Sequence, residues 1–279
     1  MIGEIFTTIL LNPTLNALIA LYKVFEQVGA PGPLGFAILS FTVILRILLW
    51  PIMAQQLRSA KKMSALSPKL NEIKKKYAKD KVMQQQKQAE LFKENGVNPA
   101  SGCLPLILQL VVLIAIYNVL SQVVSAKSPT DLINHINSVL YFPQLHLSIP
   151  LDQSFLGTSL ATKPADWAHI GLWLLIFPVL TVGLQLIQSK MMLPNTPKVP
   201  KKKDDKKNTD DFASTMASTQ QQLTLILPFM TGFFVYLYPL GLALYWNTFT
   251  LFGILQQYKI GGWGQLPQWV KFLDKERFH

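Results

Sequence analysis

The sequence predicts an all-α integral membrane protein with five transmembrane helices, and three observations lead to this prediction. Half of the 279 residues are hydrophobic and only 15% are charged, against about 25% charged residues in an ordinary soluble domain. The apolar residues form long blocks instead of amphipathic stripes, as in helices that cross a bilayer. Lysine and arginine are concentrated in alternate connections between these blocks. A single cysteine also excludes a disulfide scaffold.

The apolar blocks define the predicted spans. A helix needs about 20 residues to cross the hydrocarbon core, and the last two blocks are shorter than that. Only Pro239, Leu240 and Gly241 separate these two, so we expect a tight helical hairpin at a place where the membrane is thin. The five predicted spans cover residues 34–54, 103–125, 167–188, 223–238 and 242–258.

The charges of the connections predict the orientation. Residues 55–102 hold 11 Lys/Arg and 4 acidic residues, residues 189–222 hold 7 and 4, and residues 126–166 hold 2 and 3. Connections rich in Lys/Arg stay in the cytoplasm. The sequence therefore predicts a helical segment 55–98 and a linker 189–222 in the cytoplasm, a loop 126–166 outside, and a basic tail 259–279 inside. The setting that we expect is a bacterial plasma membrane, with the N-terminus outside.

Residues 1–30 predict an amphipathic helix that lies on the outer membrane surface. One face carries apolar residues at helical spacing, while Asn16 and Lys23 fall elsewhere. A sixth span, which would place the N-terminus inside, is the alternative. The apolar face consists of Leu15, Leu18, Ile19, Tyr22 and Phe25.

The cytoplasmic segment 55–98 predicts a basic antiparallel helical hairpin. Ser67-Pro68 is typical of a helix start, so we expect the first helix to begin there. Residues 79–81 predict a turn, and a second helix runs from about Val82 to Glu94 and ends at Asn95-Gly96. A solvated hairpin without a partner is the alternative interpretation.

Arg46 is the most informative residue, because it lies inside the first apolar block. An arginine at the centre of a spanning helix costs roughly 2.5–3.5 kcal/mol, and no Asp or Glu occurs in any predicted span. We therefore expect Arg46 to face a wet cavity, polar side chains or an acidic ligand. The alternative is an anchor that snorkels to the inner surface. The candidate polar neighbours are Ser40, Thr42, Gln109, Asn118, Gln185 and Asn247.

No motif for catalysis, metal binding or nucleotide binding is found in the sequence. The histidines have irregular spacing that does not suggest a metal site. The basic segments lack an aromatic pattern for base stacking, so specific DNA binding is not indicated. We expect a protein that is not an enzyme and has no cofactor.

A series of motifs resembles the YidC/Oxa/Alb family of membrane protein insertases over about residues 34–260. The order of these motifs along the chain makes the match specific, although Val111 and Leu240 depart from the common pattern. The motifs are Arg46 to Pro51, Lys61-Lys62-Met63, Leu66 to Lys69, Lys76-Tyr77, Asp80, Gly96 to Pro99, Gly102 to Pro105, Gln109, Tyr117, Pro239 to Asn247 and Gln256-Gln257-Tyr258.

The resemblance implies a fold and a function. Five transmembrane helices would surround a hydrophilic groove that contains Arg46 and is open to the cytoplasm and to lipid. Nascent membrane proteins would enter it without nucleotide hydrolysis, and the protein would also help them to fold. The ribosome, the general translocation channel and the signal-recognition machinery are the other expected partners. The implied groove wall adds Trp246 to the polar residues above, and the implied ribosome or targeting contacts are Lys61, Lys62, Lys74, Lys75, Lys76, Lys201, Lys202 and Lys203.

Two other functions stay open at this point. A small anion carrier would use Arg46 as the ligand for a carboxylate or phosphate, although no internal repeat supports a transporter. A passive assembly scaffold would use Arg46 only as an anchor. Saturable anion uptake would indicate the carrier, and a silent replacement of Arg46 would indicate the scaffold.

Overall fold

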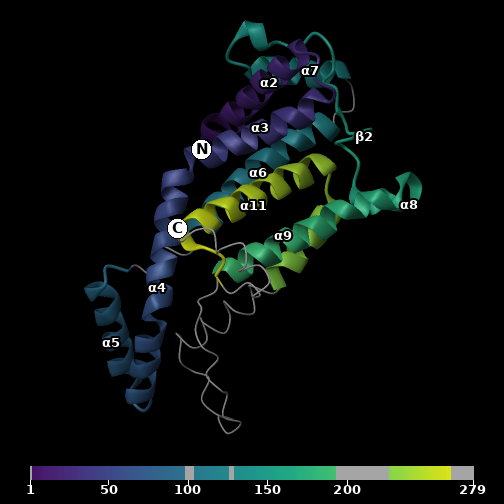
Figure 1. The fold of residues 1–279 in the computed structure, drawn as a ribbon. Coiled ribbons are helices and arrows are strands. Elements are labelled where there is room, and N and C mark those ends of the chain that lie inside the picture. The colour runs from purple at the N-terminus through teal and green to yellow at the C-terminus, as the bar shows by residue number, and fades with distance from the viewer. Residues whose placement is uncertain (1, 98–103, 126–128, 193–225, 265–279) are drawn as a thin grey trace, which may run out of the picture. The chain divides into compact units, whose positions relative to one another are not determined.

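The computed structural model describes residues 2–97, 104–125, 129–192 and 226–264, and most of them are helical (Figure 1). This agrees with the predicted all-α class. The chain divides into two compact units. The first contains residues 1–49, 106–182 and 231–252, and the second contains residues 50–105, 183–230 and 253–279.

Two strands of two residues each pair antiparallel, with Ser154 opposite Ser159. The elements are α1 (Ile2–Phe6), a π-helical turn (Thr7–Leu11), α2 (Asn12–Gln27), α3 (Pro33–Leu48), α4 (Trp50–Lys76), α5 (Lys81–Glu94), α6 (Leu104–Ser125), α7 (Pro129–Val139), a 3₁₀ turn (Pro143–Leu145), β1 (Ser154–Phe155), β2 (Thr158–Ser159), a 3₁₀ turn (Pro164–Asp166), α8 (Trp167–Ile170), a 3₁₀ turn (Leu172–Leu175), α9 (Ile176–Met192), a helix (Ile226–Leu237) and α11 (Leu240–Gly261).

Two predicted spans are interrupted, one next to a proline and the other at a glycine. The predicted span 34–54 is broken, because α3 ends at Leu48 and α4 begins at Trp50. Pro51 has no N–H to donate to Ile47, and proline disfavours helical backbone at the residue before it. The predicted span 167–188 is wrong at its start, since Gly171 with φ +145° separates α8 from the helix that follows.

The last helix is longer than predicted. Helix α11 runs over 22 residues, Leu240–Gly261, instead of residues 242–258. Its first two N–H groups, which no helical carbonyl can accept, are bound by the β2 region. Leu240 N donates to Thr162 O at 2.8 Å, and Gly241 N donates to Leu160 O at 3.0 Å. At about 1.5 Å per residue, α11 is long enough to cross a membrane, so its length gives no support for a thin bilayer there. It is not, however, among the described helices that are both long and apolar enough to cross a membrane.

Two described helices match a membrane span by length and composition, and one bent pair makes a third if it is counted as a single span. Gly3–Gln27 and Leu172–Met191 are each long and apolar enough to cross a bilayer. The pair Pro33–Leu48 and Trp50–Met63 passes the same test when it is counted as one broken span. Shorter apolar helices cover Leu110–Val119 and Ile226–Leu237.

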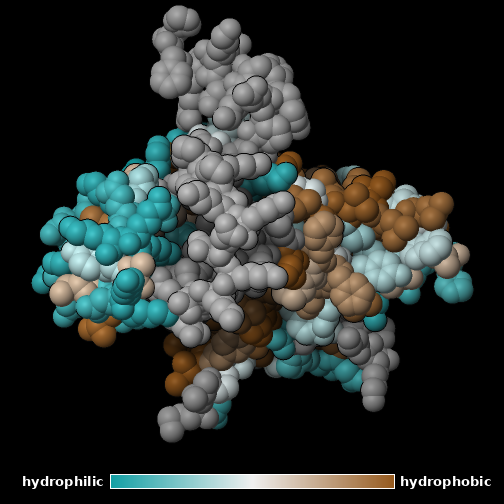
Figure 2. All heavy atoms as spheres, turned by 90° about the horizontal axis from the view of Figure 1, so that it is seen from below, coloured by the Kyte–Doolittle hydropathy of each residue, from teal (hydrophilic) through white to brown (hydrophobic). Residues whose placement is uncertain are grey.

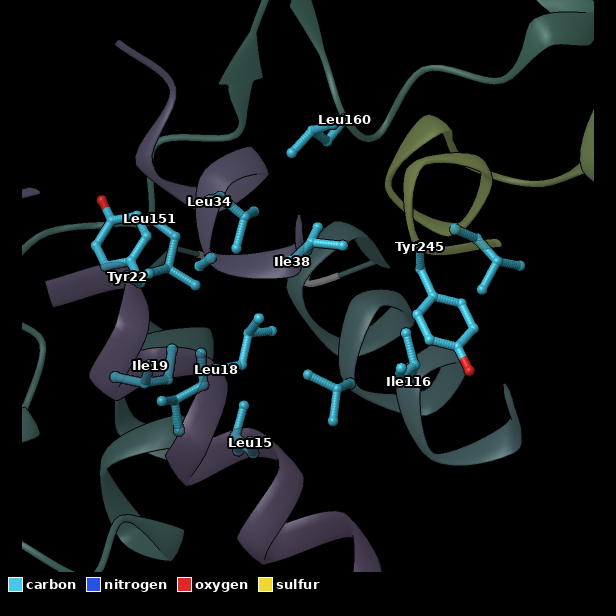
Figure 3. Packing of buried hydrophobic residues seen from close by; sticks show 14 of the residues in the cluster. Leu15, Leu18, Ile19, Tyr22, Leu34, Ile38, Ile116, Leu151, Leu160 and Tyr245 are labelled. Carbon is cyan, nitrogen blue, oxygen red and sulfur yellow. The ribbon is translucent and has the colours of Figure 1, made fainter. Parts of the chain in front are cut away.

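One hydrophobic core joins the helices of the first unit (Figure 3). The apolar face predicted for α2 is confirmed, because Leu15, Leu18, Ile19 and Tyr22 are buried in this core and Phe25 packs against it. Burying one such side chain contributes about 1.5–3 kcal/mol. The partners from the rest of the first unit include Leu34 and Ile38 of α3, Ile116 of α6, Tyr245 of α11, and the loop residues Leu151 and Leu160.

Asn16 differs from its prediction, because it is buried on the same face of α2. Its amide Nδ2 donates to Val139 O at 2.9 Å and to Asn12 O at 2.8 Å, while its Oδ1 accepts from Tyr141 N at 2.7 Å. The chain leaves α7 at these two backbone groups. A buried amide that satisfies both therefore ties the second turn of α2 to the predicted outer loop.

We expect Asn16→Ala to loosen the loop that follows α7. The substitution leaves the carbonyl of Val139 and the N–H of Tyr141 without this partner, which costs about 1–3 kcal/mol for a buried polar group. Limited proteolysis of the outer loop, in membranes of known sidedness, measures the effect. Asn12→Ala is the matched control, because Asn12 contributes its backbone carbonyl to this contact. Equal cleavage of the two variants would contradict the role of Asn16.

The second unit contains a charged helical hairpin of α4 and α5. Its first helix begins before the predicted start, since α4 runs through Pro68 without a break. The turn and second helix agree with prediction: Asp80 Oδ1 accepts from Met83 N at 2.9 Å, and α5 ends before Asn95 and Gly96, where Gly96 has φ +61°. Hydrophilic residues gather over this hairpin in Figure 2.

Candidate functional site

Arg46 lies in the last turn of α3 and is 4% exposed. Its guanidinium donates twice to one backbone oxygen of α11, from Nε to Phe249 O at 3.0 Å and from Nη2 to the same oxygen at 2.6 Å. The guanidinium carbon also lies 3.4 Å from the centroid of the Phe249 ring, a cation–π contact. Among the residues that the structure describes, no carboxylate forms an ion pair with Arg46.

The neighbouring turn of α3 presents a second polar residue on the same side. Thr42 precedes Arg46 by four residues, and residues at this spacing share a helix face. Thr42 is fully buried, and its hydroxyl donates to Ile38 O at 2.6 Å. This bond satisfies the Thr42 hydroxyl within its own helix. Thr42 is therefore a small buried polar group beside Arg46, and its proton is bound to Ile38 O.

Asn247 and Trp246 of α11 have different environments. Asn247 is 8% exposed, and its Oδ1 accepts from the hydroxyl of Thr181 in α9 at 2.8 Å. Trp246 is half-buried, and its indole Nε1 is shielded from solvent with no hydrogen-bond partner among the described residues. A shielded N–H without an acceptor is costly, so the Trp246 indole is an unsatisfied donor in this part of the structure.

The other predicted groove residues are not all brought to Arg46. Ser40 is half-buried, two residues before Thr42 on α3. Asn118 is half-buried and donates to Ile114 O of its own helix at 2.7 Å. Gln185 is half-buried in the second unit. Gln109 lies outside the residues whose side chains are described.

The predicted ribosome contacts fall in two places. Those on the hairpin lie on α4, where Lys74 is half-buried and the others are exposed. The remaining three, Lys201, Lys202 and Lys203, lie outside the described residues. The exposed lysines of α4 are Lys61, Lys62, Lys75 and Lys76.

Sequence reasoning missed two residues of this site, Phe249 and Thr181, and one buried polar residue of the second unit, Gln256. Phe249 binds Arg46 mainly through its backbone oxygen. Every residue has such an oxygen, so the residue type could not identify this partner. Thr181 could have been found, since it is a polar residue in an apolar block, four positions before Gln185. Gln256 is 1% exposed and donates from Nε2 to Trp50 O at 3.2 Å, within the second unit. Its position in the motif Gln256-Gln257-Tyr258 was the available signal.

This arrangement offers one strong kind of chemistry, which is the recognition of an anion. A guanidinium has five N–H donors in a planar fork that matches a carboxylate with two parallel bonds. A backbone carbonyl is a neutral acceptor, so a carboxylate would bind Arg46 more strongly than Phe249 O does. The apolar surroundings strengthen such an attraction relative to water.

Comparison with known proteins places the chain in a family. The family described as "60Kd inner membrane protein" matches residues 24–264. The chain belongs to the YidC/Oxa/Alb family of membrane protein insertases. It is 31% identical to the membrane protein insertase YidC of Fusobacterium nucleatum over 229 residues, which cover 82% of this chain and 86% of that protein.

Other relatives in the YidC/Oxa/Alb family span bacteria and a chloroplast. The membrane protein insertase YidC of Oceanobacillus iheyensis is 31% identical, over 80% of this chain and 72% of that protein. The inner membrane ALBINO3-like protein 1 of Chlamydomonas reinhardtii is 30% identical, over 88% of this chain and 48% of that protein. The family assignment confirms the resemblance that the motifs indicated, and it establishes a membrane protein.

Proposed function

We propose that this chain is a membrane protein insertase that guides nascent membrane proteins into the bilayer and helps them to fold. The observation that supports it best is Arg46, a buried cation without a carboxylate partner among the described residues. Its present acceptor is a neutral carbonyl. An acidic outer segment of a substrate would supply the missing carboxylate.

The proposed mechanism is an exchange of partners at Arg46. A substrate carboxylate replaces Phe249 O, and the bidentate pair lowers the cost of moving a polar segment part-way across the membrane. The apolar segment of the substrate then leaves into lipid, where burial of about 20 apolar residues drives the step without nucleotide. The hydrophilic groove proposed around Arg46 includes Ser40, Thr42, Gln109, Asn118, Trp246 and Asn247.

The proposed topology places the N-terminus outside and the C-terminus in the cytoplasm of a bacterial plasma membrane. The contacts of α2 support an interfacial position for this helix. Asn16, near the middle of the helical segment Gly3–Gln27, bonds to Val139 and Tyr141, and the Tyr22 hydroxyl accepts from Asp152 N at 3.0 Å. All three partners lie in the predicted outer loop, whereas the middle of a spanning helix would lie deep in hydrocarbon.

The proposed ribosome contacts lie on the hairpin, where α4 presents exposed lysines. Ribosomal RNA is negatively charged, and each phosphate contact contributes a salt-dependent term to the affinity. We propose the translocation channel and the signal-recognition machinery as further partners of the basic segments. The linker lysines Lys201, Lys202 and Lys203 belong to the same proposal.

We expect replacement of four exposed lysines of α4 by glutamine to weaken ribosome binding and flatten its salt dependence. Each lost phosphate contact lowers the salt slope by about one, so the slope should fall by up to about four. Co-sedimentation with ribosomes over a series of salt concentrations measures it. The four residues are Lys61, Lys62, Lys75 and Lys76.

Lys87 provides the matched control on the same hairpin. Its ammonium bonds Glu90 at 2.6 Å, a contact that raises the pKa of Lys87 and already neutralises its charge. Lys87→Gln should therefore leave the salt slope nearly unchanged. A slope that falls equally in Lys87→Gln and in a single Lys62→Gln would argue against a defined contact surface.

Proteoliposomes that contain only this protein test the proposed function. Ribosomes translate a single-span protein with an acidic outer tail, and protease protection reports its insertion. Insertion above the level of empty liposomes supports the proposal. Saturable uptake of a small anion without insertion would favour a carrier. If the protein shows neither activity, the passive scaffold is the remaining function.

A further inference from the structure

A cavity of about 250 Å³ lies in the first unit, away from Arg46. The strands β1 and β2 and the connection between them form one wall, and the first turns of the helices at 172–177 and of α11 form the others. Its lining is almost entirely apolar, and Thr158 provides the one side-chain hydroxyl. The lining includes Phe155, Leu156, Thr158, Trp173, Phe177 and Leu244.

Backbone contacts hold the walls of this cavity in place. The N–H groups of Leu240 and Gly241 donate to Thr162 O and Leu160 O, which fixes the start of α11 against the strand region. The Phe155 ring lies against Gly35 of α3 and meets Phe36 edge to face, with ring centroids 5.4 Å apart. The cavity is therefore part of the fold before any ligand arrives.

The rim of the cavity is continuous with apolar surface that faces outward. Leu156 is 80% exposed, and Ile176 is 62% exposed. Val179 and Leu180 continue this exposed surface along α9. In a membrane protein such a surface contacts lipid, so the cavity opens toward hydrocarbon.

The position of the cavity along the helices sets its depth. Trp173 is the second residue of the segment Leu172–Met191, and tryptophan prefers the membrane interface. Phe177 lies four residues further on, and Leu244 lies four residues after the first residue of α11. At about 1.5 Å per residue, the two lie about 6–8 Å below the helix starts, at the level of the upper part of the acyl chains.

We propose that this cavity binds one acyl chain of a membrane lipid. Water is a poor occupant, because an apolar cavity offers it too few hydrogen-bond partners, and apolar cavities of about 150 Å³ already accept benzene. A peptide segment is also disfavoured, since among the lining side chains its amide groups would find only the Thr158 hydroxyl and the Trp173 indole N–H. An acyl chain restores the dispersion contacts that an empty void lacks, and lipid surrounds the rim at very high concentration. The inference needs α9 and α11 to cross the bilayer, and it does not need insertion activity.

Photo-crosslinking without translation tests this proposal. The full chain is reconstituted in vesicles of phosphatidylethanolamine and phosphatidylglycerol that contain a lipid with a diazirine in its acyl chain. After illumination, mass spectrometry maps the crosslinked residues. We expect crosslinks at Phe155 and Leu160, which are 8% and 4% exposed and would not otherwise meet lipid. Val179 and Leu180 are the internal control for ordinary lipid contact.

A filled cavity provides the matched variant. Thr158→Phe should reduce the crosslinks at Phe155 and Leu160 several-fold and leave those at Val179 and Leu180 unchanged. Leu244→Phe fills the cavity from another wall and should do the same, which covers the case in which Thr158→Phe disturbs the strands. Crosslinks at Val179 and Leu180 without any in the cavity would overturn the proposal. Loss of the cavity crosslinks on addition of a single-span peptide, at unchanged control crosslinks, would assign the cavity to peptide and overturn it as well.

Discussion

Arg46→Ala is expected to lower the insertion of single-span proteins with acidic outer tails about tenfold. A hydrogen bond to a charged group contributes about 1.5–3 kcal/mol, but the carboxylate replaces the two bonds that Arg46 already makes to Phe249 O. We therefore expect a net contribution of about one such bond, and about 1.4 kcal/mol corresponds to a factor of ten in rate. Arg46→Lys keeps the charge but loses the planar fork, so its insertion should fall between wild type and alanine. Protease protection in proteoliposomes, with equal amounts of each variant, measures the three rates.

A neutral outer tail separates recognition from stability. Arg46 also joins α3 to α11 through Phe249 O, so its removal could weaken the fold as well as the site. Weakened folding would lower insertion of both substrates alike. Loss of carboxylate recognition would lower insertion of the acidic substrate alone.

Phe249→Leu is the matched control for the contact itself. It removes the ring that lies 3.4 Å from the guanidinium and keeps the backbone oxygen that Arg46 bonds. We expect a small effect, because the cation–π contact is worth only about 0.5–2 kcal/mol and the substrate carboxylate does not use it. Equal insertion of acidic and neutral substrates by Arg46→Ala would show that Arg46 is only a structural anchor.

Arg46 was predictable from the sequence, but its partner was not. A charge in an apolar block stands out because its insertion into the membrane costs free energy. The acceptor at Phe249 is a backbone oxygen, and every residue of α11 has one. Only the packing of α3 against α11 selects this oxygen. Polar side chains in the predicted spans, such as Asn118, were predicted to be neighbours of Arg46. The Asn118 amide instead donates to a carbonyl of its own helix.

The fold was predictable where one face of a helix decides burial. Periodicity identified the buried face of α2, because the apolar side chains repeat with the helical turn. It failed for Asn16, whose burial depends on two backbone groups at the end of α7. The break after Leu48 reflects local proline chemistry, while the extension of α11 to Leu240 depends on carbonyls of the β2 region that lie far away in the sequence.

Gly35→Ala is expected to destabilise the first unit by about 1–3 kcal/mol, the usual cost of forcing extra atoms into a packed core. A Cβ at position 35 would overlap the ring of Phe155 at Cδ2, so the ring or the helix must move. Because Phe155 also lines the cavity, the same change should alter the acyl-chain crosslinks there. Thermal unfolding in detergent micelles measures the stability.

Gly183→Ala is the control with the opposite expected sign. Gly183 lies in α9, and a Cβ there would meet no atom within 4 Å. Alanine is favoured over glycine inside a helix by about 0.5–1 kcal/mol, so this variant should be more stable than wild type. Helix propensity favours the same exchange at position 35, and only the Phe155 ring opposes it.

The double variant Gly35→Ala/Phe155→Leu tests whether the Phe155 ring is the reason that alanine is unfavourable at position 35. Leucine lacks the ring atoms that the new Cβ would meet, so the two changes should cost less together than the sum of the single costs. Strict additivity would mean that the glycine is needed for another reason, such as backbone conformation. A coupling of about 1 kcal/mol or more would instead assign the need for glycine to the close approach of Phe155. The strand region would then hold the start of α3, the helix that carries Arg46 at its other end.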